Sequence, residues 1–472
     1  MKTPGSTMLI VKRRDQDSFI SILMSFACCK IAHPRPLIEQ IEPRRRRAEL
    51  ARFISVKVAI IGGGAAGMMT AYLLDPAHEV TVFERQPILG GNIRTLGRNV
   101  ECSALPTGVV LDAGVIEFSP TQFPRLHRLF AALGVETREV AAMAGLITAD
   151  GVHFQSISKI AASGAPLQGR LVAGLRLLGL APAFARFHWR ARAAVAALEA
   201  SPGRPVGEYL GPSGSPLGEW LRLLLMYGYS IPRAQIDQLP AALALPTLRA
   251  FTLESSWTSI VGGIYGYIDA IVRALRGRVI TDALIDGISR TQGGDRGLIE
   301  IRRRGAEAER FDAVVIATTP AQVLRLLSDP CEHEEQRFAA WTGNDANAVI
   351  HTDSSIYRRR GIHNYSEFDV FARPPGYNAY LNRLCGLPAE HATDYHFSYN
   401  LDAEIDSEKI LHRQNHRTPN YTVEAFSTRR EIIETNGDRH TYYAGAWLGN
   451  GLHEGALCSA LAVSKRLGGR LL

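Results

Sequence analysis

The strongest constraint on this chain of 472 residues is a glycine-rich turn that directly follows an apolar, β-branched run. Residues 56–61 read VKVAII and predict a buried parallel strand. Residues 62–67 match the pattern G-x-G-x-x-G, and a helix is expected over 68–74. A second strand over 79–83 ends at Glu84, about twenty residues past the first glycine. This order of elements predicts a Rossmann-type dinucleotide-binding unit.

Each residue of the turn has an expected physical role. Gly62 permits a tight strand-to-helix turn, Gly64 lets a pyrophosphate approach the backbone, and Gly67 allows the helix to pack closely on the strand. The first helical residues offer unpaired N–H groups to phosphates. The acid that ends the second strand is expected to accept hydrogen bonds from a ribose diol. The residues predicted to contact the cofactor here are Gly62, Gly64, Ala65, Ala66, Gly67, Glu84 and Arg85.

The segment after Glu84 resembles one protein family. It contains the pair Gly90-Gly91, then Asn92, and soon after it the run Asp112-Ala113-Gly114. This resembles the flavin amine oxidase superfamily, which includes amine oxidases, protoporphyrinogen oxidase and phytoene-type desaturases. The resemblance implies that the dinucleotide is FAD, with Gly90, Gly91 and Asn92 close to it. Many members have Arg or His where this chain has Asn92.

Two later segments extend the resemblance. Residues 311–318, which include Ala317, are similar to the family's strand that returns to the FAD domain. Residues 443–456 and the helix that follows to about Leu467 are similar to its last strand and helix, where a helix N-terminus would stabilise reduced flavin. A branch known as predicted NAD/FAD-binding proteins shows a similar Gly-x-Gly-x-His-Glu-Gly end. The matching residues include Gly449, Gly451, His453, Glu454 and Gly455, and the likeness spans 56–468.

The resemblance also indicates candidate catalytic residues. His453 and Glu454 are the main candidates, because their loop is expected to abut the flavin, and a structural hydrogen bond is the alternative role for each. Gly445 and Gly455 are expected to contact the cofactor, and Ile285 is the candidate for a backbone contact near adenine. Seven further polar residues are candidates to face substrate, and an ordinary surface or core role is favoured for each one: His351, Asp353, Tyr357, Tyr365, Tyr380, Asn382 and Arg383.

The predicted fold class is α/β, a Rossmann-type FAD/NAD(P)-binding domain with a three-layer sandwich and a discontinuous α+β substrate domain. We assign 56–119, 250–330 and 436–472 to the FAD-binding domain, and 120–249 and 331–435 to the substrate domain. Residues 120–249 are expected to be rich in helices. Within them, an apolar stretch from Leu171 to Ala200 carries several arginines, and Pro182 is expected to break it. Core-facing helices explain this stretch, and contact with a membrane surface is the alternative.

Composition excludes several classes of protein. The net charge is +7, but residues 1–55 hold eleven basic and five acidic residues, so the remaining chain is nearly neutral and nucleic acid is not an expected partner. Residues 1–55 are predicted to be a disordered leader, with a targeting or membrane-contact segment as the alternative. The six cysteines form no zinc-ligand spacing, so we expect no metal and free thiols in the cytoplasm. The sequence does not indicate an oligomeric state.

The expected chemistry is hydride transfer between the flavin and a hydrophobic small molecule, because flavin carries the redox reaction. Many amine oxidases of the superfamily place a lysine near the flavin, whereas this chain has no lysine between Lys159 and Lys409. That favours a desaturase, dehydrogenase or reductase, and the closer branch implies fatty acyl chains. An amine oxidase that releases peroxide and aldehyde is one alternative. A non-catalytic, membrane-associated flavin-binding protein is another.

Overall fold

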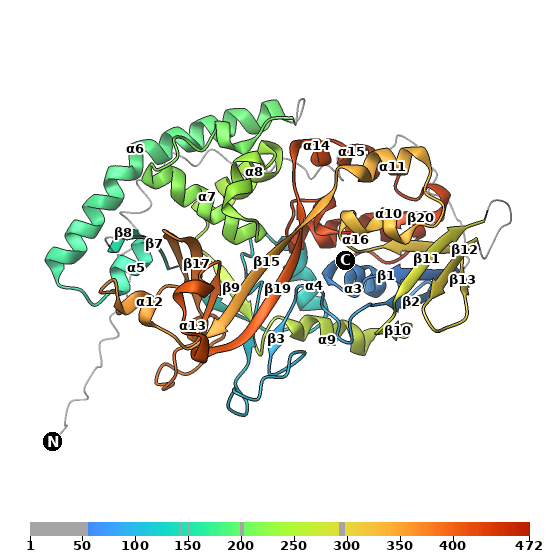
Figure 1. Cartoon of the computed structure of the whole chain (residues 1–472), viewed down its shortest axis with the longest axis horizontal. Coiled ribbons are helices and arrows are strands. Elements are labelled where there is room, and N and C mark those ends of the chain that lie inside the picture. The colour runs from blue at the N-terminus through green and yellow to red at the C-terminus, as the bar shows by residue number, and fades with distance from the viewer. Residues whose placement is uncertain (1–54, 142, 150, 199–202, 292–297) are drawn as a thin grey trace, which may run out of the picture.

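A computed structural model describes residues 55–141, 143–149, 151–198, 203–291 and 298–472. The predicted leader therefore lies outside the described residues, apart from Ser55. At the right of Figure 1 lies a parallel five-stranded sheet in the order β10-β2-β1-β14-β20. Its strands are β1 (Lys57–Ile61), β2 (Glu79–Phe83), β10 (Arg278–Ile280), β14 (Ala313–Ile316) and β20 (Thr441–Tyr443).

Two further layers cover this sheet. Helix α3 (Ala65–Leu74) packs between α16 (His453–Leu467) and α9 (Tyr265–Ala274) on one face. The antiparallel sheet of β11 (Ile285–Arg290), β12 (Ile299–Arg303) and β13 (Glu309–Phe311) covers the other face, where the ring of Phe311 meets that of Phe83 edge-on. The structure thus has the predicted three-layer sandwich, in which β-branched strand residues are enclosed between two layers.

A second, seven-stranded sheet has the order β19-β15-β18-β17-β16-β7-β8. Its strands are β7 (Ala144–Thr148), β8 (Gly151–Gln155), β15 (Thr342–His351), β16 (Phe368–Ala372), β17 (Pro375–Tyr380), β18 (His396–Tyr399) and β19 (Ile410–Asn420). The parallel pairing of β16 with β7 joins two segments more than two hundred residues apart in sequence. The sequence predicted helices for 120–249 and missed the strands β7 and β8 within that range. These two strands pair with each other, and only β7 joins the rest of the sheet, through the distant β16.

Helices cover one side of the second sheet (Figure 1). The principal ones are α6 (Leu167–Leu198), α7 (Pro216–Tyr229) and α8 (Ala241–Leu253), and α6 packs along α8. The prediction that Pro182 breaks the helix was wrong, because α6 continues through it. Pro182 lies on the exposed side of α6, so the carbonyl group that loses its partner is able to bond water.

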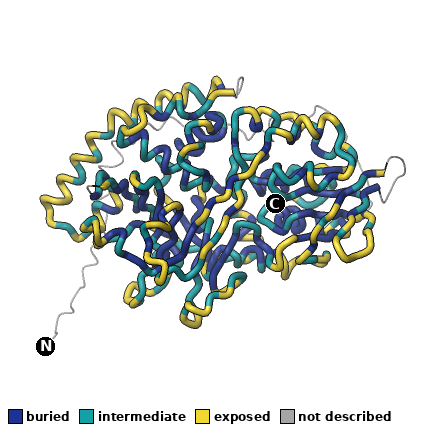
Figure 2. The backbone as a smooth tube through the Cα atoms, in the orientation of Figure 1, coloured by how far each residue is buried: buried dark blue, intermediate teal, exposed yellow. Residues whose placement is uncertain are grey.

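Shorter elements complete the described chain. The short strands are β3 (Thr95–Leu96), β4 (Leu111–Asp112), β5 (Glu117–Phe118), β6 (Thr137–Val140) and β9 (Trp257–Ile260). The short helices are α4 (Pro124–Ala132), α5 (Ile157–Ala162), α10 (Val323–Leu326), α11 (Glu332–Ala339), α12 (Ser355–Arg358), α13 (Leu381–Leu384), α14 (Val423–Ser427) and α15 (Arg429–Glu434). One large core runs through both sheets, and Figure 2 shows the buried backbone at the centre of each half.

Several sequence expectations concern absences. Within the described ranges, no helix is both long and apolar enough to cross a bilayer. The same residues contain no cluster of His, Cys, Asp or Glu suited to a metal ion. Among the described cysteines, Cys102, Cys331, Cys385 and Cys458 form no disulfide with one another, whereas Cys28 and Cys29 lie outside the described residues.

Candidate active site

A cavity of about 1170 Å³ begins at the carboxyl ends of β1, β14 and β20 and extends toward the seven-stranded sheet. Its wall includes the glycine turn after β1, the loop after β14 and the segment that leads into α16. In open parallel sheets, ligands bind at this edge, where the loops that follow the strands converge. The topology therefore brings segments from four distant parts of the chain to one site.

The glycine turn is packed so closely that side chains are excluded from it. Gly62 has a φ of +110°, and a Cβ atom there would lie 2.9 Å from the carbonyl oxygen of Ala317. A Cβ atom on Gly67 would lie 1.9 Å from the carbonyl oxygen of Gly62. Helix α3 has no side-chain cap at its N-terminus, so its first N–H groups face the cavity beside Gly64 and Ala65. This is the arrangement that binds a pyrophosphate.

Glu84 holds this turn in place. Its carboxylate accepts a hydrogen bond from the Gly63 N–H at 2.7 Å and another from the Gln86 N–H at 2.8 Å. The side chain is buried and still forms part of the cavity wall. Free lone pairs on the carboxylate remain for a ribose hydroxyl. The ribose contact itself stays a prediction.

The Gly90-Gly91 turn passes directly over the first glycine turn. Gly90 donates its N–H to the Gly63 carbonyl at 2.8 Å, and Gly90 and Gly91 both have positive φ values, +109° and +61°. The side chain of Asn92 exchanges hydrogen bonds with the backbone of Arg417 in β19, at 2.9 and 3.3 Å. Asn92 therefore connects the turn to the second sheet, a role that no local sequence pattern revealed.

Most of the residues predicted to bind the cofactor line this one cavity. They are Gly62, Gly64, Ala65, Ala66, Glu84, Arg85, Gly90, Gly91, Asn92, Ile285, Ala317 and Gly445. Gly67 and Gly455 do not line it. Gly67 separates α3 from β1, and Gly455 lies against Gly449, where a Cβ atom built on Gly449 would come within 2.4 Å of the Gly455 Cα. Both glycines therefore allow close packing of the backbone behind the cavity wall and do not line the cavity themselves.

The other end of the cavity is walled by aromatic rings. They come from several elements: Phe123, Tyr227, Tyr229, Phe251, Trp257, Tyr377, Tyr421 and Trp447. The rings of Tyr227 and Tyr377 pack edge-on, with their centroids 4.8 Å apart. Sequence reasoning missed these residues, because they are scattered over more than three hundred positions and form no local motif. Such a wall suits an apolar ligand.

Glu117 is the acidic side chain at this aromatic end. It is 8% exposed, and its carboxyl accepts a hydrogen bond from the Tyr227 hydroxyl. Burial raises the pKa of Glu117 to about 7, although the hydrogen bond from Tyr227 opposes the rise. An acid with a pKa near neutrality is able both to accept and to donate a proton. No sequence pattern pointed to Glu117.

His453 is at the first position of α16, on the cavity wall. Its ring lies edge-on to Phe118 at 5.4 Å and to Tyr267 at 6.3 Å. Burial lowers the pKa of His453 to about 4, so the imidazole is neutral near pH 7. The site thus has a neutral hydrogen-bonding group at the N-terminus of the last helix, and its chemical role stays a prediction.

Glu454 points in another direction. Its carboxylate accepts hydrogen bonds from the backbone N–H groups of Arg125 and Leu126 at 3.1 and 3.0 Å, and it pairs with the Arg125 guanidinium at 3.5 Å. It therefore caps the N-terminus of α4 and is not part of the cavity wall. This geometry favours the structural alternative for Glu454.

We expect Glu454→Ala to destabilise the protein by about 0.5–2 kcal/mol, because two backbone donors and Arg125 lose their partner. Urea unfolding of both proteins, monitored by circular dichroism, measures this difference. Flavin content and the rate of flavin reduction should stay within about twofold of those of the parent. Unchanged stability combined with lost chemistry would instead indicate a catalytic Glu454.

Four buried polar atoms of cavity-lining side chains have no hydrogen-bond partner among the described residues. They are Glu117 Oε2, His416 Nε2, Trp447 Nε1 and His453 Nε2. Buried polar atoms in folded proteins are almost always satisfied. A ligand with polar groups at several points along the cavity would satisfy them, and an extended dinucleotide together with a substrate has this character. The residues present therefore fit a bound flavin dinucleotide.

The polar candidates from the middle of the sequence lie elsewhere. None of His351, Asp353, Tyr357, Tyr365, Tyr380, Asn382 and Arg383 is among the described residues that line the cavity. They form internal bonds instead: His351 Nε2 bonds the Ser398 hydroxyl at 2.9 Å, and Arg383 pairs with Glu367 at 2.5 Å. The cavity wall, as described, also contains no lysine, and Lys159 is paired with Asp369 at 3.0 Å in the core.

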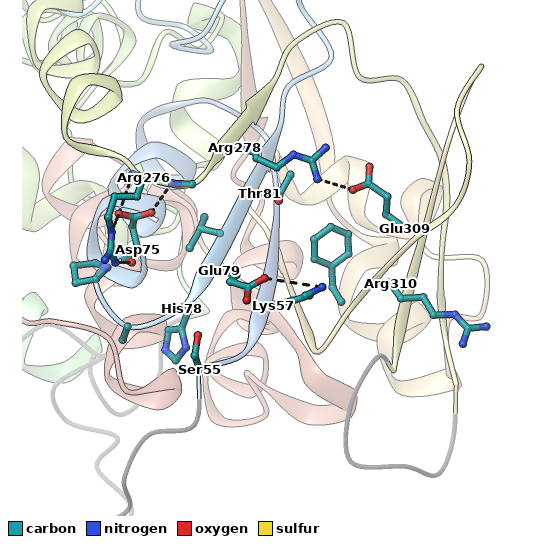
Figure 3. A pocket seen from close by; sticks show the side chains of 15 residues that line it. Ser55, Lys57, Asp75, His78, Glu79, Thr81, Arg276, Arg278, Glu309 and Arg310 are labelled. Atoms are coloured by element: carbon teal, nitrogen blue, oxygen red, sulfur yellow. Dashed lines mark hydrogen bonds and ion pairs between the residues drawn. The ribbon is translucent and has the colours of Figure 1, made fainter.

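A second cavity of about 650 Å³ lies at the amino ends of β1, β2 and β10, away from the glycine turn (Figure 3). Most of its charged side chains are already engaged in ion pairs. Arg276 bonds Asp75 at 3.2 Å, and Arg278 bonds Glu309 at 3.0 Å. These pairs resemble an ordinary solvated surface, so we assign the site to the larger cavity.

Comparison with known proteins supports the fold. Residues 60–133 match the family of NAD(P)-binding Rossmann-like domains. A zeta-carotene desaturase from Zea mays is 56% identical over 39 residues, and one from Solanum lycopersicum is 38% identical over 84 residues. These matches span 8% and 18% of this chain, and only 7% and 12% of the two relatives.

Solved structures match over most of the chain. A putrescine oxidase bound to putrescine has a TM-score of 0.64 at 13% identity, covering 88% of this chain and all of that one. A fatty acid isomerase from P. acnes that produces CLA scores 0.62 at 15% identity, covering 89% and 99%. Cyclohexylamine oxidase from Brevibacterium oxydans scores 0.58 at 14% identity, covering 88% and 100%. The chain therefore shares the fold of these two oxidases and of the isomerase, and its residues 60–133 match an NAD(P)-binding Rossmann-like domain.

Proposed function

We propose that this protein is an FAD-dependent oxidoreductase that transfers a hydride between the flavin and a hydrophobic small molecule. The observation that carries the proposal is one continuous cavity that runs from the glycine turn to an aromatic chamber containing Glu117. In this proposal, residues 56–119, 250–330 and 436–472 hold the cofactor, and 120–249 and 331–435 form the chamber for substrate.

The glycine turn and Glu84 would hold the adenosine and pyrophosphate parts of FAD. The segment from Gly445 to His453 would lie beside the ring end, because it borders the aromatic chamber. Bound FAD supplies two-electron chemistry as an acceptor or donor of hydride. The protein's contribution is to orient an apolar substrate, exclude water and manage one proton.

Glu117 is the residue that we assign to that proton. In the oxidative direction, bound FAD would supply the acceptor for a hydride, which leaves the substrate with the electron pair of one C–H bond. The adjacent carbon loses a proton to the Glu117 carboxylate. The electron pair of that C–H bond stays on the substrate and forms the C=C bond. In the reductive direction, protonated Glu117 returns the proton. The Tyr227 hydroxyl orients the carboxyl group for either direction.

We favour long acyl chains as substrates. The chamber is lined by aromatic rings, and the charges around it are few, which suits an extended apolar chain. One matched protein is a fatty acid isomerase, which agrees with this class, and another is a carotene desaturase, whose named substrate is also a long apolar chain. A desaturase, dehydrogenase or reductase would each use the same geometry.

Oxidation of an amine is the second candidate. Putrescine oxidase and cyclohexylamine oxidase share the fold, and an ionised Glu117 among aromatic rings would attract an ammonium group. Against it stands the chamber's other lining, which in the described residues contains no lysine. A third possibility is a flavin-binding protein without catalysis. It does not explain why the chamber contains Glu117, an acid whose pKa is raised.

The test begins with purified full-length protein. Its visible spectrum and the mass of the released cofactor identify FAD, and anaerobic stopped-flow absorbance then measures flavin reduction by unsaturated and saturated acyl compounds and by amines. We expect acyl compounds to bleach the flavin and amines to leave it oxidised. Bleaching by amines with release of peroxide would establish the second candidate. The third possibility, a flavin-binding protein without catalysis, would be established if no donor reduces the flavin and the chemically reduced flavin transfers no electrons to acyl acceptors.

A further inference from the structure

Helix α6 exposes an unusual amount of apolar surface. Of the eleven large hydrophobic side chains that are exposed in the described part of the chain, six belong to α6. They are Leu167, Leu171, Val172, Leu175, Leu178 and Trp189, with Trp189 73% and Leu167 72% exposed. Ile157 on the neighbouring α5 is a seventh. Figure 2 shows the helix at the rim of the molecule with its outer side exposed along most of its length.

Five of the six exposed residues of α6 form one stripe, and Val172 lies beside it. Leu167, Leu171, Leu175 and Leu178 follow one another at spacings of four, four and three residues, so their side chains lie along a single face of α6. Trp189 continues the same face three turns later. The opposite face carries the residues that pack inward, including Phe184, Phe187 and Ala191. Core packing therefore accounts for one side of the helix and leaves the outer stripe without a partner among the described residues.

Positive charge borders this stripe. Helix α6 contains five arginines, and residues 151–198 contain no aspartate or glutamate. Arg170 and Arg176 donate hydrogen bonds to the backbone carbonyl groups of Ala161 and Val152 at 3.3 and 3.1 Å. These bonds fix the positions of the two guanidinium groups, and because the carbonyl groups are neutral the positive charges remain. The remaining arginines are Arg186, Arg190 and Arg192, all exposed.

We propose that the outer face of α6 docks on the surface of an anionic phospholipid membrane, with the helix parallel to the membrane plane. Leucine side chains on one stripe would enter the interface between headgroups and acyl chains, and the arginines beside them would meet lipid phosphates. Trp189 fits the same depth, because tryptophan prefers the membrane–water interface. The inference stands independently of the reaction proposed above.

The positive charge of this face favours a membrane over two other possible partners, a second copy of the chain and the leader. A second copy of the chain in a symmetric dimer would bring the same arginine-rich surface against itself, which like charges disfavour. The leader is also a poor match, because residues 1–55 carry eleven basic and five acidic residues. An anionic lipid surface complements both the apolar stripe and the charge.

Helix α6 is linked to one wall of the aromatic chamber, so docking through α6 would also position the cavity. The helix packs along α8, whose Phe251 forms part of the aromatic chamber, and His188 of α6 bonds the Thr252 hydroxyl at 3.0 Å. Docking through α6 would therefore hold this wall of the chamber close to the bilayer, where apolar molecules are concentrated.

Vesicle flotation with the full chain tests the proposal. Vesicles of phosphatidylglycerol with phosphatidylcholine should carry the protein upward, whereas phosphatidylcholine alone should bind it at least about tenfold less. The double variant L175E/L178E should lose at least about tenfold in binding to the anionic vesicles, because charged groups replace buried apolar ones. R186E/R190E should lose a similar factor, and added salt should weaken binding by the parent. Leu471→Glu, at a site 63% exposed away from α6, is the matched control and should bind as the parent does.

Two results would overturn the proposal. One is vesicle binding by L175E/L178E equal to that of the parent, which would place the contact elsewhere in the chain. The other is a dimer in sedimentation experiments that L175E/L178E converts to monomer, which would identify the stripe as an interface between copies. Thermal unfolding and flavin content verify that each variant is folded.

Discussion

Replacement of Gly67 by alanine is expected to yield a protein that contains little or no flavin and unfolds at a lower temperature. The added Cβ atom would lie 1.9 Å from the Gly62 carbonyl oxygen, and that oxygen belongs to backbone that cannot rotate away. Helix α3 would have to shift from β1, which costs about 1–3 kcal/mol or more and moves the N–H groups expected to bind the pyrophosphate.

The measurement is the ratio of visible to ultraviolet absorbance of the purified variant, together with its thermal midpoint with and without added FAD. Gly174→Ala is the matched control, because Gly174 lies in α6 and a Cβ atom there meets nothing within 4 Å. Alanine is favoured over glycine in a helix by about 0.5–1 kcal/mol, so this control should be as stable as the parent or slightly more stable. A fully flavinylated G67A protein with parental stability would contradict the assigned turn.

Replacement of Glu117 by glutamine is expected to slow flavin reduction by about 10²–10⁴-fold, the usual contribution of a positioned acid or base. In the parent, the rate should rise with pH through the pKa of Glu117, about 7, because only the carboxylate accepts a proton. In Glu117→Gln that rise should disappear. Tyr227→Phe is a graded variant: loss of its hydrogen bond to the carboxylate should raise the pKa and move the profile to higher pH.

Other titrating groups face Glu117 and have to be considered in this profile. Asp112 raises the pKa of Glu117 further, and burial raises the pKa of Asp112 itself to about 6. Tyr377 and Cys385 also interact with Glu117, and burial raises the pKa of each well above neutrality. They stay protonated over the range in which Glu117 titrates. Rates of Glu117→Gln that still rise through about pH 7 would assign the titration to another group.

Stability gives an independent measure of the same carboxyl. The pKa of Glu117 is raised from 4.5 to about 7 in the folded protein, so folding favours the protonated form. The associated stability is present below pH 4.5 and is lost as pH rises through about 7. Glu117→Gln should therefore be more stable than the parent at pH 8, by roughly 1–3 kcal/mol, and equal to it near pH 4. Guanidinium unfolding at the two pH values measures the difference, and a variant less stable than the parent at pH 8 would contradict a desolvated carboxylate at this position.

The sequence by itself determined the dinucleotide turn and the layers around it. Gly62, Gly67 and Glu84 lie within about twenty residues of one another, and their spacing is set by one strand, one turn and one helix. Such contacts follow from backbone geometry that is local in sequence. For the same reason the return strand at Ala317 and the last helix from His453 were recognisable, because each is a short segment with a pattern of its own.

Only the tertiary structure decided what surrounds the substrate chamber. Glu117 and Tyr227 are 110 residues apart, and Glu454 caps a helix more than three hundred residues before it in the chain. The outer face of α6 is another example, because its leucines resemble core residues in sequence and are seen to be exposed only once the inner face is packed. Burial, orphaned polar atoms and raised pKa values arise from contacts between distant segments, and those contacts form only when the whole chain is folded.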